Sequence, residues 1–254
     1  MSLSEQELHD LVQALRGLTP MQVAWVRSAI QAFGVSRQFE RAADSDLVTP
    51  EVLAALGDRL MAHHAGSRQA LSKDRFEFAF EAALNAAGMP ARLVTSRTNR
   101  GHDLDIRGVP FSLKTEASAA IQDDWIHVSK WMELGRGAWD LVLLRGLFLE
   151  HLQSYERILT LRRLKAVEAM HRYELVEIPK ALLLESAHCT LEVVSKSRQV
   201  PQPGHGHVLD AQGQHQYTLY FDGGTERKLQ LRRLRKSLCK VHATWRFGAM
   251  STPA

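Results

Sequence analysis

Hydrophobic residues recur at helical spacing in the first part of the chain, and strand-like alternation follows later. Three early runs of apolar residues each follow a helix-capping residue, namely Ser4, Thr19 and Thr49, and proline follows the last two. These signals predict three helices. We therefore expect residues 1–70 to form an N-terminal helical region packed on a core of residues 71–254, the whole chain making one compact domain.

A fourth helix is predicted over residues 73–87. Ser72 can cap its first turn, three phenylalanines and a leucine give it a broad apolar face, and a glycine and a proline follow its end. Glu77 and Glu81 are one turn apart on this helix, so both can point toward the element that follows it.

The rest of the chain reads as a mixture of strands and helices with no repeat and no low-complexity linker. We expect a short strand at 125–128, mostly helix over 131–155, two core strands near 158–161 and 173–178, and a helix from Pro179. Three more strands are expected to form an antiparallel C-terminal extension, at 217–221, 228–232 and 241–247, preceded by a loop over 201–207. This mixture predicts an α/β fold.

Two short alternating runs, 103–106 and 109–116, are joined by Arg107 and Gly108. A two-residue turn with glycine at a position that favours positive φ predicts a hairpin. In that register Leu104 faces Phe111 and Asp103 faces Ser112, because side chains alternate between the two faces of a strand. The leucine and phenylalanine then belong to the buried face.

The other face of this hairpin carries the chemistry. Lys114 and Glu116 follow Ser112 on the face that carries Asp103. Two carboxylates and a lysine on one face can hold Mg²⁺, orient an attacking water and neutralise charge on a phosphate oxygen. The competing interpretation is a surface hairpin with solvated charges, since aspartate and lysine at this spacing are common.

The Asp–x–Lys arrangement resembles the PD-(D/E)xK nuclease superfamily, with two departures. His102 stands where the pattern has proline, and Ser112 stands at the first acidic position of the second half-motif. The resemblance implies that another acid completes the site. The candidates are Glu116 on the same strand face and, on the preceding helix, Glu77, which we favour over Glu81.

Five further strings resemble, in this order, the SmaI family of Type II restriction endonucleases: SRTNRGHD, HVSKWMELG, YERILTLRRLK, LVEIPKALLLE and LYFDGG with ERKLQL. The resemblance runs nearly end to end. It implies a PD-(D/E)xK restriction-endonuclease-like mixed β-sheet flanked by helices. It also implies a homodimer that cuts double-stranded DNA at CCCGGG with Mg²⁺ and leaves blunt ends, with a cognate DNA methyltransferase as its functional counterpart.

Composition agrees with a DNA-directed protein without identifying one. The chain has 254 residues, 45% of them hydrophobic, and a formal net charge of +4, which suits a polyanionic partner. It has two cysteines, no apolar run long enough to cross a bilayer and no secretory signal at its polar N-terminus. We therefore expect a cytoplasmic protein and no membrane partner.

Candidate DNA contacts are basic and amide side chains near the hairpin and within the matched strings. A G-rich site calls for arginine or lysine donating two hydrogen bonds to guanine, and we name Arg157 and Lys130 as base readers. The full set of predicted contacts is Arg97, Asn99, Lys130, Arg136, Arg157 and Arg162.

Two other functions remain open from the residues alone. One is a repair or structure-selective nuclease of the same superfamily, and the other is a non-catalytic DNA-binding protein that keeps the fold. Specific fragments from plasmid digestion separate a restriction enzyme from the first, and metal-dependent cleavage of any kind excludes the second.

Overall fold

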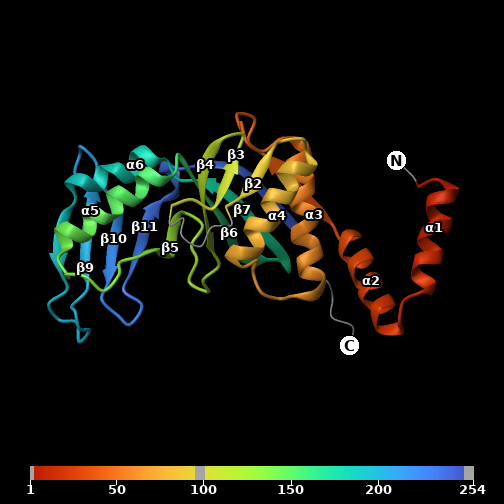
Figure 1. Ribbon diagram of the computed structural model, residues 1–254, viewed down its shortest axis with the longest axis horizontal. Coiled ribbons are helices and arrows are strands. Elements are labelled where there is room, and N and C mark those ends of the chain that lie inside the picture. Colours follow the sequence, from red (N-terminus) through yellow and green to blue (C-terminus); the bar gives the residue numbers. More distant parts are fainter. Residues whose placement is uncertain (1–2, 95–100, 249–254) are drawn as a thin grey trace.

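The computed structural model describes residues 3–94 and 101–248, which form two β-sheets with helices packed on them (Figure 1). The seven-stranded sheet has the order β1-β12-β7-β6-β4-β3-β2, and the five-stranded sheet has the order β5-β11-β10-β9-β8. The predicted α/β class is confirmed at this level.

The seven-stranded sheet is mixed, because β4 and β6 are parallel while its other neighbouring strands are antiparallel. The parallel pairing aligns Glu116 with Arg162, two residues that are far apart in the sequence. The strands are β1 (Arg37–Arg41), β12 (Lys240–Gly248), β7 (Met170–Glu177), β6 (Arg157–Val167), β4 (Val109–Glu116), β3 (Leu104–Ile106) and β2 (Ala91–Leu93).

The helices α3 (Pro50–Gly66) and α4 (Lys73–Ala86) pack on this sheet through one hydrophobic core. Thr49 and Ser72 cap them as predicted, each accepting a hydrogen bond from a backbone amide of the first turn. Phe76 and Phe80 are fully buried and stack at 5.5 Å between ring centroids. This packing fixes the face that α4 presents to the hairpin.

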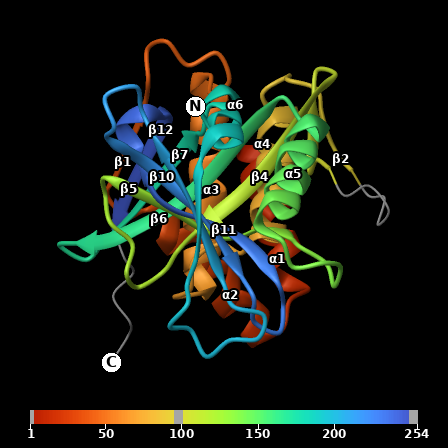
Figure 2. The same cartoon turned by 90° about the vertical axis from the view of Figure 1, so that its left-hand side faces the viewer.

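The five-stranded sheet forms the other end of the molecule. Figure 2 faces this end and shows helices α5 (Leu141–His151) and α6 (Lys180–Leu184) beside its strands. Leu144 and Phe148 of α5 join the second hydrophobic core, with side chains from the sheet. The strands are β5 (Trp125–Glu133), β11 (Lys228–Arg235), β10 (His215–Asp222), β9 (Gly204–Leu209) and β8 (Thr190–Val193).

The predicted hairpin is present as β3 and β4, with the predicted register of Leu104 opposite Phe111 and Ile106 opposite Val109. Arg107 and Gly108 both have positive φ, 52° and 81°, as a two-residue turn of this kind requires.

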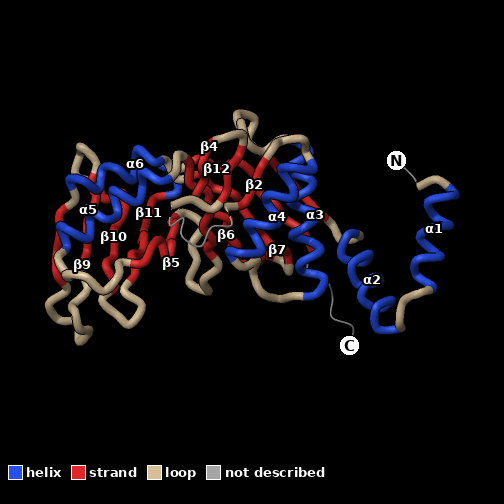
Figure 3. The backbone as a smooth tube through the Cα atoms, in the orientation of Figure 1, coloured by secondary structure: helices blue, strands red, loops and turns tan. Residues whose placement is uncertain are grey.

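The helices α1 (Glu5–Arg16) and α2 (Pro20–Phe33) project from one end of the molecule (Figure 3). Each begins with a capping box, so the helix starts at Ser4 and Thr19 are confirmed. No residue of α1 is buried, and Trp25 of α2 keeps 68% of its surface exposed. Their apolar faces therefore contribute little to the core of this chain.

Several predictions about individual elements were wrong. Residues 131–133 continue β5, and helix begins only at Leu141, because β5 pairs along its length with the distant strand β11. The predicted loop 201–207 becomes strand from Gly204 onward. The last strand, β12, lies between β1 and β7 of the seven-stranded sheet and not in the C-terminal extension. Residues 37–41, inside the expected helical region, form β1.

Candidate active site

Asp103 lies directly before β3, at the end of the hairpin where α4 packs. Its Oδ2 atom accepts hydrogen bonds from the Leu113 amide at 2.6 Å and from the Ser112 hydroxyl at 3.2 Å. These two hydrogen bonds fix the orientation of the carboxylate, and its other oxygen, Oδ1, contacts the Lys73 ammonium. The predicted juxtaposition of Asp103 and Ser112 is therefore present.

Lys114 lies on β4, and its side chain is buried. Its ammonium nitrogen lies 5.5 Å from the centre of the Trp131 ring, a cation–π contact. Burial lowers the pKa of Lys114 to about 8, against an opposing effect of the Asp103 carboxylate. A lysine with so low a pKa is a candidate for a functional group.

Glu77 reaches the same place from α4. The Lys73 ammonium contacts Glu77 one turn along the helix and also lies 2.7 Å from Oδ1 of Asp103. Burial raises the pKa of Glu77, whereas the pKa of Asp103 falls despite burial because Lys114 and Lys73 lie beside it. One cation therefore contacts both carboxylates.

A cleft of about 730 Å³ lies beside these groups, and Glu77 adjoins it through its contact with Lys73. Its lining includes Lys73, Asp103 and Lys114, the β5 segment 128–133 and His151 of α5. Burial lowers the pKa of His151 to about 4, so its ring is neutral near neutral pH. The charged side chains thus lie where a ligand larger than a water molecule can reach them.

Glu116 is placed differently from the prediction. It is buried against Arg162, to which its Oε2 is paired, and its Oε1 accepts the His127 amide at 3.0 Å. Both carboxylate oxygens are used by other groups, which argues against Glu116 as the second metal ligand. Glu81 accepts the Leu93 amide at 2.8 Å and holds β2 on the helix. Glu77 is the acid that lies beside Asp103.

The predicted DNA contacts fall into different surroundings. Arg97 and Asn99 lie outside the described residues. Lys130 lines the cleft and is exposed, although Glu133 and Glu226 pair with it, and Arg136 is exposed beside a neighbouring hollow. Arg162 is fully buried, so it cannot contact DNA in this structure.

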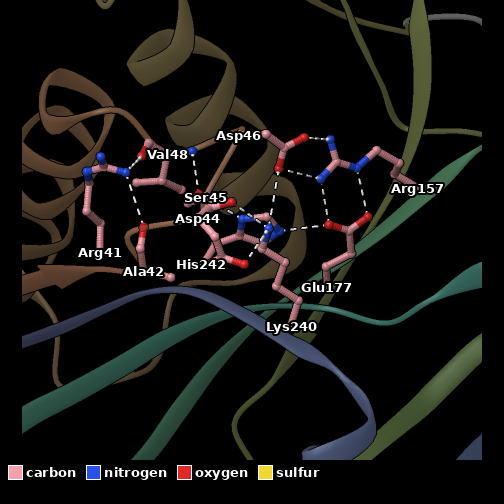
Figure 4. A network of polar contacts seen from close by, with 10 residues as sticks. All are labelled: Arg41, Ala42, Asp44, Ser45, Asp46, Val48, Arg157, Glu177, Lys240 and His242. Carbon is pink, nitrogen blue, oxygen red and sulfur yellow. Dashed lines mark hydrogen bonds and ion pairs between the residues drawn. The ribbon is translucent and has the colours of Figure 1, made fainter.

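Arg157 is bound within the protein by two carboxylates (Figure 4). Its guanidinium donates to Glu177 at 2.7 and 2.6 Å and to Asp46 at 2.7 and 3.1 Å. Glu177 also contacts His242 at 2.7 Å, and Asp46, Glu177 and His242 have ligand atoms within 4.8 Å of one another. Arg157 contacts both carboxylates of this cluster, Lys240 lies 4.0 Å from Asp46, and Arg157 does not line the cleft.

We expect Arg157→Ala to lower the free energy of unfolding by ~1–3 kcal/mol, because Glu177 then loses its main partner while half-buried. Urea denaturation measures the loss, with Lys130→Ala as the exposed control. Sequence discrimination by the folded fraction should not change. A variant of normal stability that no longer distinguishes the target site from singly substituted sites would restore Arg157 as a base reader.

The pKa of Lys114 gives a second expected result. Below about pH 8, Lys114 is protonated in both the folded and the unfolded chain, so the folded state bears the full cost of the buried charge. Between about pH 8 and the pKa near 10.4 that lysine has in an unfolded chain, only the unfolded chain keeps the proton. The free energy of unfolding therefore rises with pH in this range. In EDTA, Lys114→Met should therefore raise the melting temperature near pH 7, and the gain should shrink above pH 8. Melting curves across this range test it, with exposed Lys165→Met as control. A loss of stability near pH 7 would contradict the sign.

Comparison with known proteins identifies the family. The family model described as SmaI, Type II site-specific deoxyribonuclease, matches residues 11–247. The chain is also 49% identical over 218 residues to the Type II restriction enzyme SmaI of Serratia marcescens, covering 86% of this chain and 88% of the relative. The chain belongs to the SmaI family of Type II site-specific deoxyribonucleases. No solved structure matches the chain.

Membership of the SmaI family makes the protein a DNA-directed nuclease, and enzymes of this type generally need a divalent metal ion. The donor set fits such an ion, because Asp103 and Glu77 present carboxylate oxygens close enough for one ammonium to contact both. No helix among the described residues is long and apolar enough to cross a membrane.

Sequence reasoning missed three residues of this site. The sequence did indicate Lys73, since it is four residues from Glu77 on the predicted helix and can pair with it. The sequence did not indicate Trp131 or His151, because they reach the hairpin from the second sheet and from α5.

Proposed function

We propose that the chain is the endonuclease of a restriction–modification system and hydrolyses both strands of duplex DNA at a PD-(D/E)xK centre. The observation that supports this most is the grouping of Asp103 and Lys114 at one cleft, with Glu77 joined to Asp103 through Lys73, in a chain of the SmaI family. Ser112 replaces the usual strand acid and hydrogen-bonds Asp103, while Glu77 supplies a carboxylate from α4.

Asp103 and Glu77 would hold Mg²⁺, which favours carboxylate oxygens. When bound, this ion supplies positive charge that stabilises the phosphorane-like transition state and lowers the pKa of a water ligand. Lys114 lies beside Asp103 on a rigid strand, and its ammonium can donate to a phosphate oxygen or orient the attacking water. Ser112 and the Leu113 amide hold the Asp103 carboxylate in one orientation. Attack in line with the leaving oxygen would leave a 5′-phosphate and a 3′-hydroxyl.

We propose CCCGGG, cut at its centre to leave blunt ends, as the target, on the strength of the likeness to SmaI. A palindromic site calls for a two-fold symmetric protein, hence a homodimer. The apolar side chains that α1 and α2 expose are consistent with a second copy as their partner, because the described residues of this chain leave Leu11 and Trp25, among others, largely exposed. Light scattering on the purified protein measures the oligomeric state.

The proposal has three further parts, of which the first two follow from the function. A cognate DNA methyltransferase would protect the host sites, and action on incoming DNA places the enzyme in the cytoplasm. The 1–70 region and the 71–254 core are proposed to form one compact domain, since β1 pairs with β12.

Incubation of the purified protein with plasmid and Mg²⁺, followed by sequencing of the fragment ends, tests the function. We expect discrete fragments whose blunt ends read CCC and GGG. Staggered ends or another hexamer would refute the proposed target while keeping a restriction enzyme. Cleavage without sequence preference would favour a repair or structure-selective nuclease, and no cleavage with any divalent metal would favour a DNA-binding protein without activity.

A further inference from the structure

Lys73 is the first residue of α4, a position at which a helix does not favour a positively charged side chain. The N-terminus of a helix carries partial positive charge, so a lysine there is destabilising unless other groups compensate. Here the compensation comes from Asp103 and Glu77, which together raise the pKa of Lys73 although burial opposes them. The ammonium is therefore held by the candidate centre and not by the helix.

The ammonium uses the same oxygens that a metal ion would need. Oδ2 of Asp103 already accepts from Leu113 and Ser112, so Oδ1 is the oxygen that faces a cation, and Lys73 lies 2.7 Å from it. The Oε1 atom of Glu77 is the ammonium's second partner. A divalent ion and this ammonium cannot both occupy the space between the two carboxylates.

We propose that Lys73 is a built-in competitor for the metal, whose ammonium must leave Asp103 and Glu77 before a divalent ion binds there. The inference rests on the proposed metal site. The side chain of Lys73 keeps 39% of its surface exposed, whereas Glu77 keeps 17% and Asp103 21%. The lysine is thus the partner with a path to solvent, and its long flexible stem lets it move without a change in the backbone. Lys73 then raises the concentration of metal ion that is needed to occupy the site between Asp103 and Glu77.

Binding of Mn²⁺ to the DNA-free protein tests this directly, with free Mn²⁺ measured by electron paramagnetic resonance. Removing the competing charge should lower the Mn²⁺ dissociation constant of Lys73→Met at least about tenfold, since both the broken contacts and the charge repulsion disappear. Lys130→Met is the matched control, because it removes one positive charge from the same cleft without touching either carboxylate. It should change the constant less than about twofold.

Melting in EDTA gives a second readout. Without Lys73 the two carboxylates lose their shared cation, so Lys73→Met should melt below wild type, and saturating Ca²⁺ should raise its melting temperature more than that of wild type. Lys73→Gln repeats both measurements with a polar side chain in case methionine disturbs the helix. An Mn²⁺ affinity of the Lys73 variants equal to or weaker than that of wild type overturns the inference.

Asp103→Asn, added to Lys73→Met, separates this failure from a failure of the proposed site. If the double variant loses Mn²⁺ binding while Lys73→Met alone shows no tightening, the metal site stands and only the competition is wrong. If the double variant binds Mn²⁺ as tightly as Lys73→Met, the ion is held elsewhere and both proposals fall.

Discussion

Asp103→Asn and Lys114→Met should each reduce DNA cleavage by at least about a thousandfold, with specific binding in Ca²⁺ kept within about tenfold, or ~1.4 kcal/mol. Asparagine can still accept the hydrogen bonds from Leu113 and Ser112 but lacks the charge that a metal ion needs. Methionine fills the space of the buried lysine and removes its ammonium. Single-turnover cleavage at saturating enzyme measures the chemical step separately from binding.

Binding in Ca²⁺ is the necessary control for both variants, because a misfolded protein would lose cleavage and binding together. Exposed Lys165→Met is matched to Lys114→Met and should cleave normally. Cleavage within tenfold of wild type by either active-site variant would remove that residue from the mechanism.

Glu77→Gln should lose cleavage nearly as completely as Asp103→Asn, while Glu116→Gln should mainly lose stability. Glu77 shares the Lys73 ammonium with Asp103, whereas Glu116 is buried against Arg162. Neutralising Glu116 leaves the fully buried Arg162 with one fewer negative partner, a change that costs ~1–3 kcal/mol or more. Cleavage by each variant, measured well below its melting temperature, separates the two effects.

Glu81→Gln serves as the matched control for Glu77→Gln, because it is one turn along the same helix and hydrogen-bonds the backbone of β2. It should cut DNA at a rate close to wild type. If Glu116→Gln is stable and inactive while Glu77→Gln cuts normally, the second acid belongs to the strand, as the sequence pattern first suggested.

The active-site hairpin could be predicted because its information is local. Alternation of apolar and polar residues sets the two faces, and the glycine turn sets the register, so the pairing of Leu104 with Phe111 required no knowledge of the rest of the chain. The caps at Ser72 and Thr49 are local signals of the same kind.

The partners of the polar residues could not be predicted, since they come from distant segments. The parallel pairing of β4 with β6 places Arg162 beside Glu116. Asp46, which is more than a hundred residues earlier in the chain, pairs with Arg157. Nothing local to Arg157 or Arg162 showed that each pairs with carboxylates inside the protein. β5 was cut short for the same reason, because its partner β11 lies about a hundred residues later in the chain.

A crystal structure of the protein with a CCCGGG duplex and Mn²⁺, with the ion located by its anomalous scattering, would show directly whether Asp103 and Glu77 hold the metal. We expect anomalous density between Asp103 and Glu77, next to the scissile phosphate, with the Lys73 ammonium moved away and Lys114 facing the phosphate. Density instead at the cluster of Asp46, Glu177 and His242, with Lys73 still on both carboxylates, would contradict this expectation.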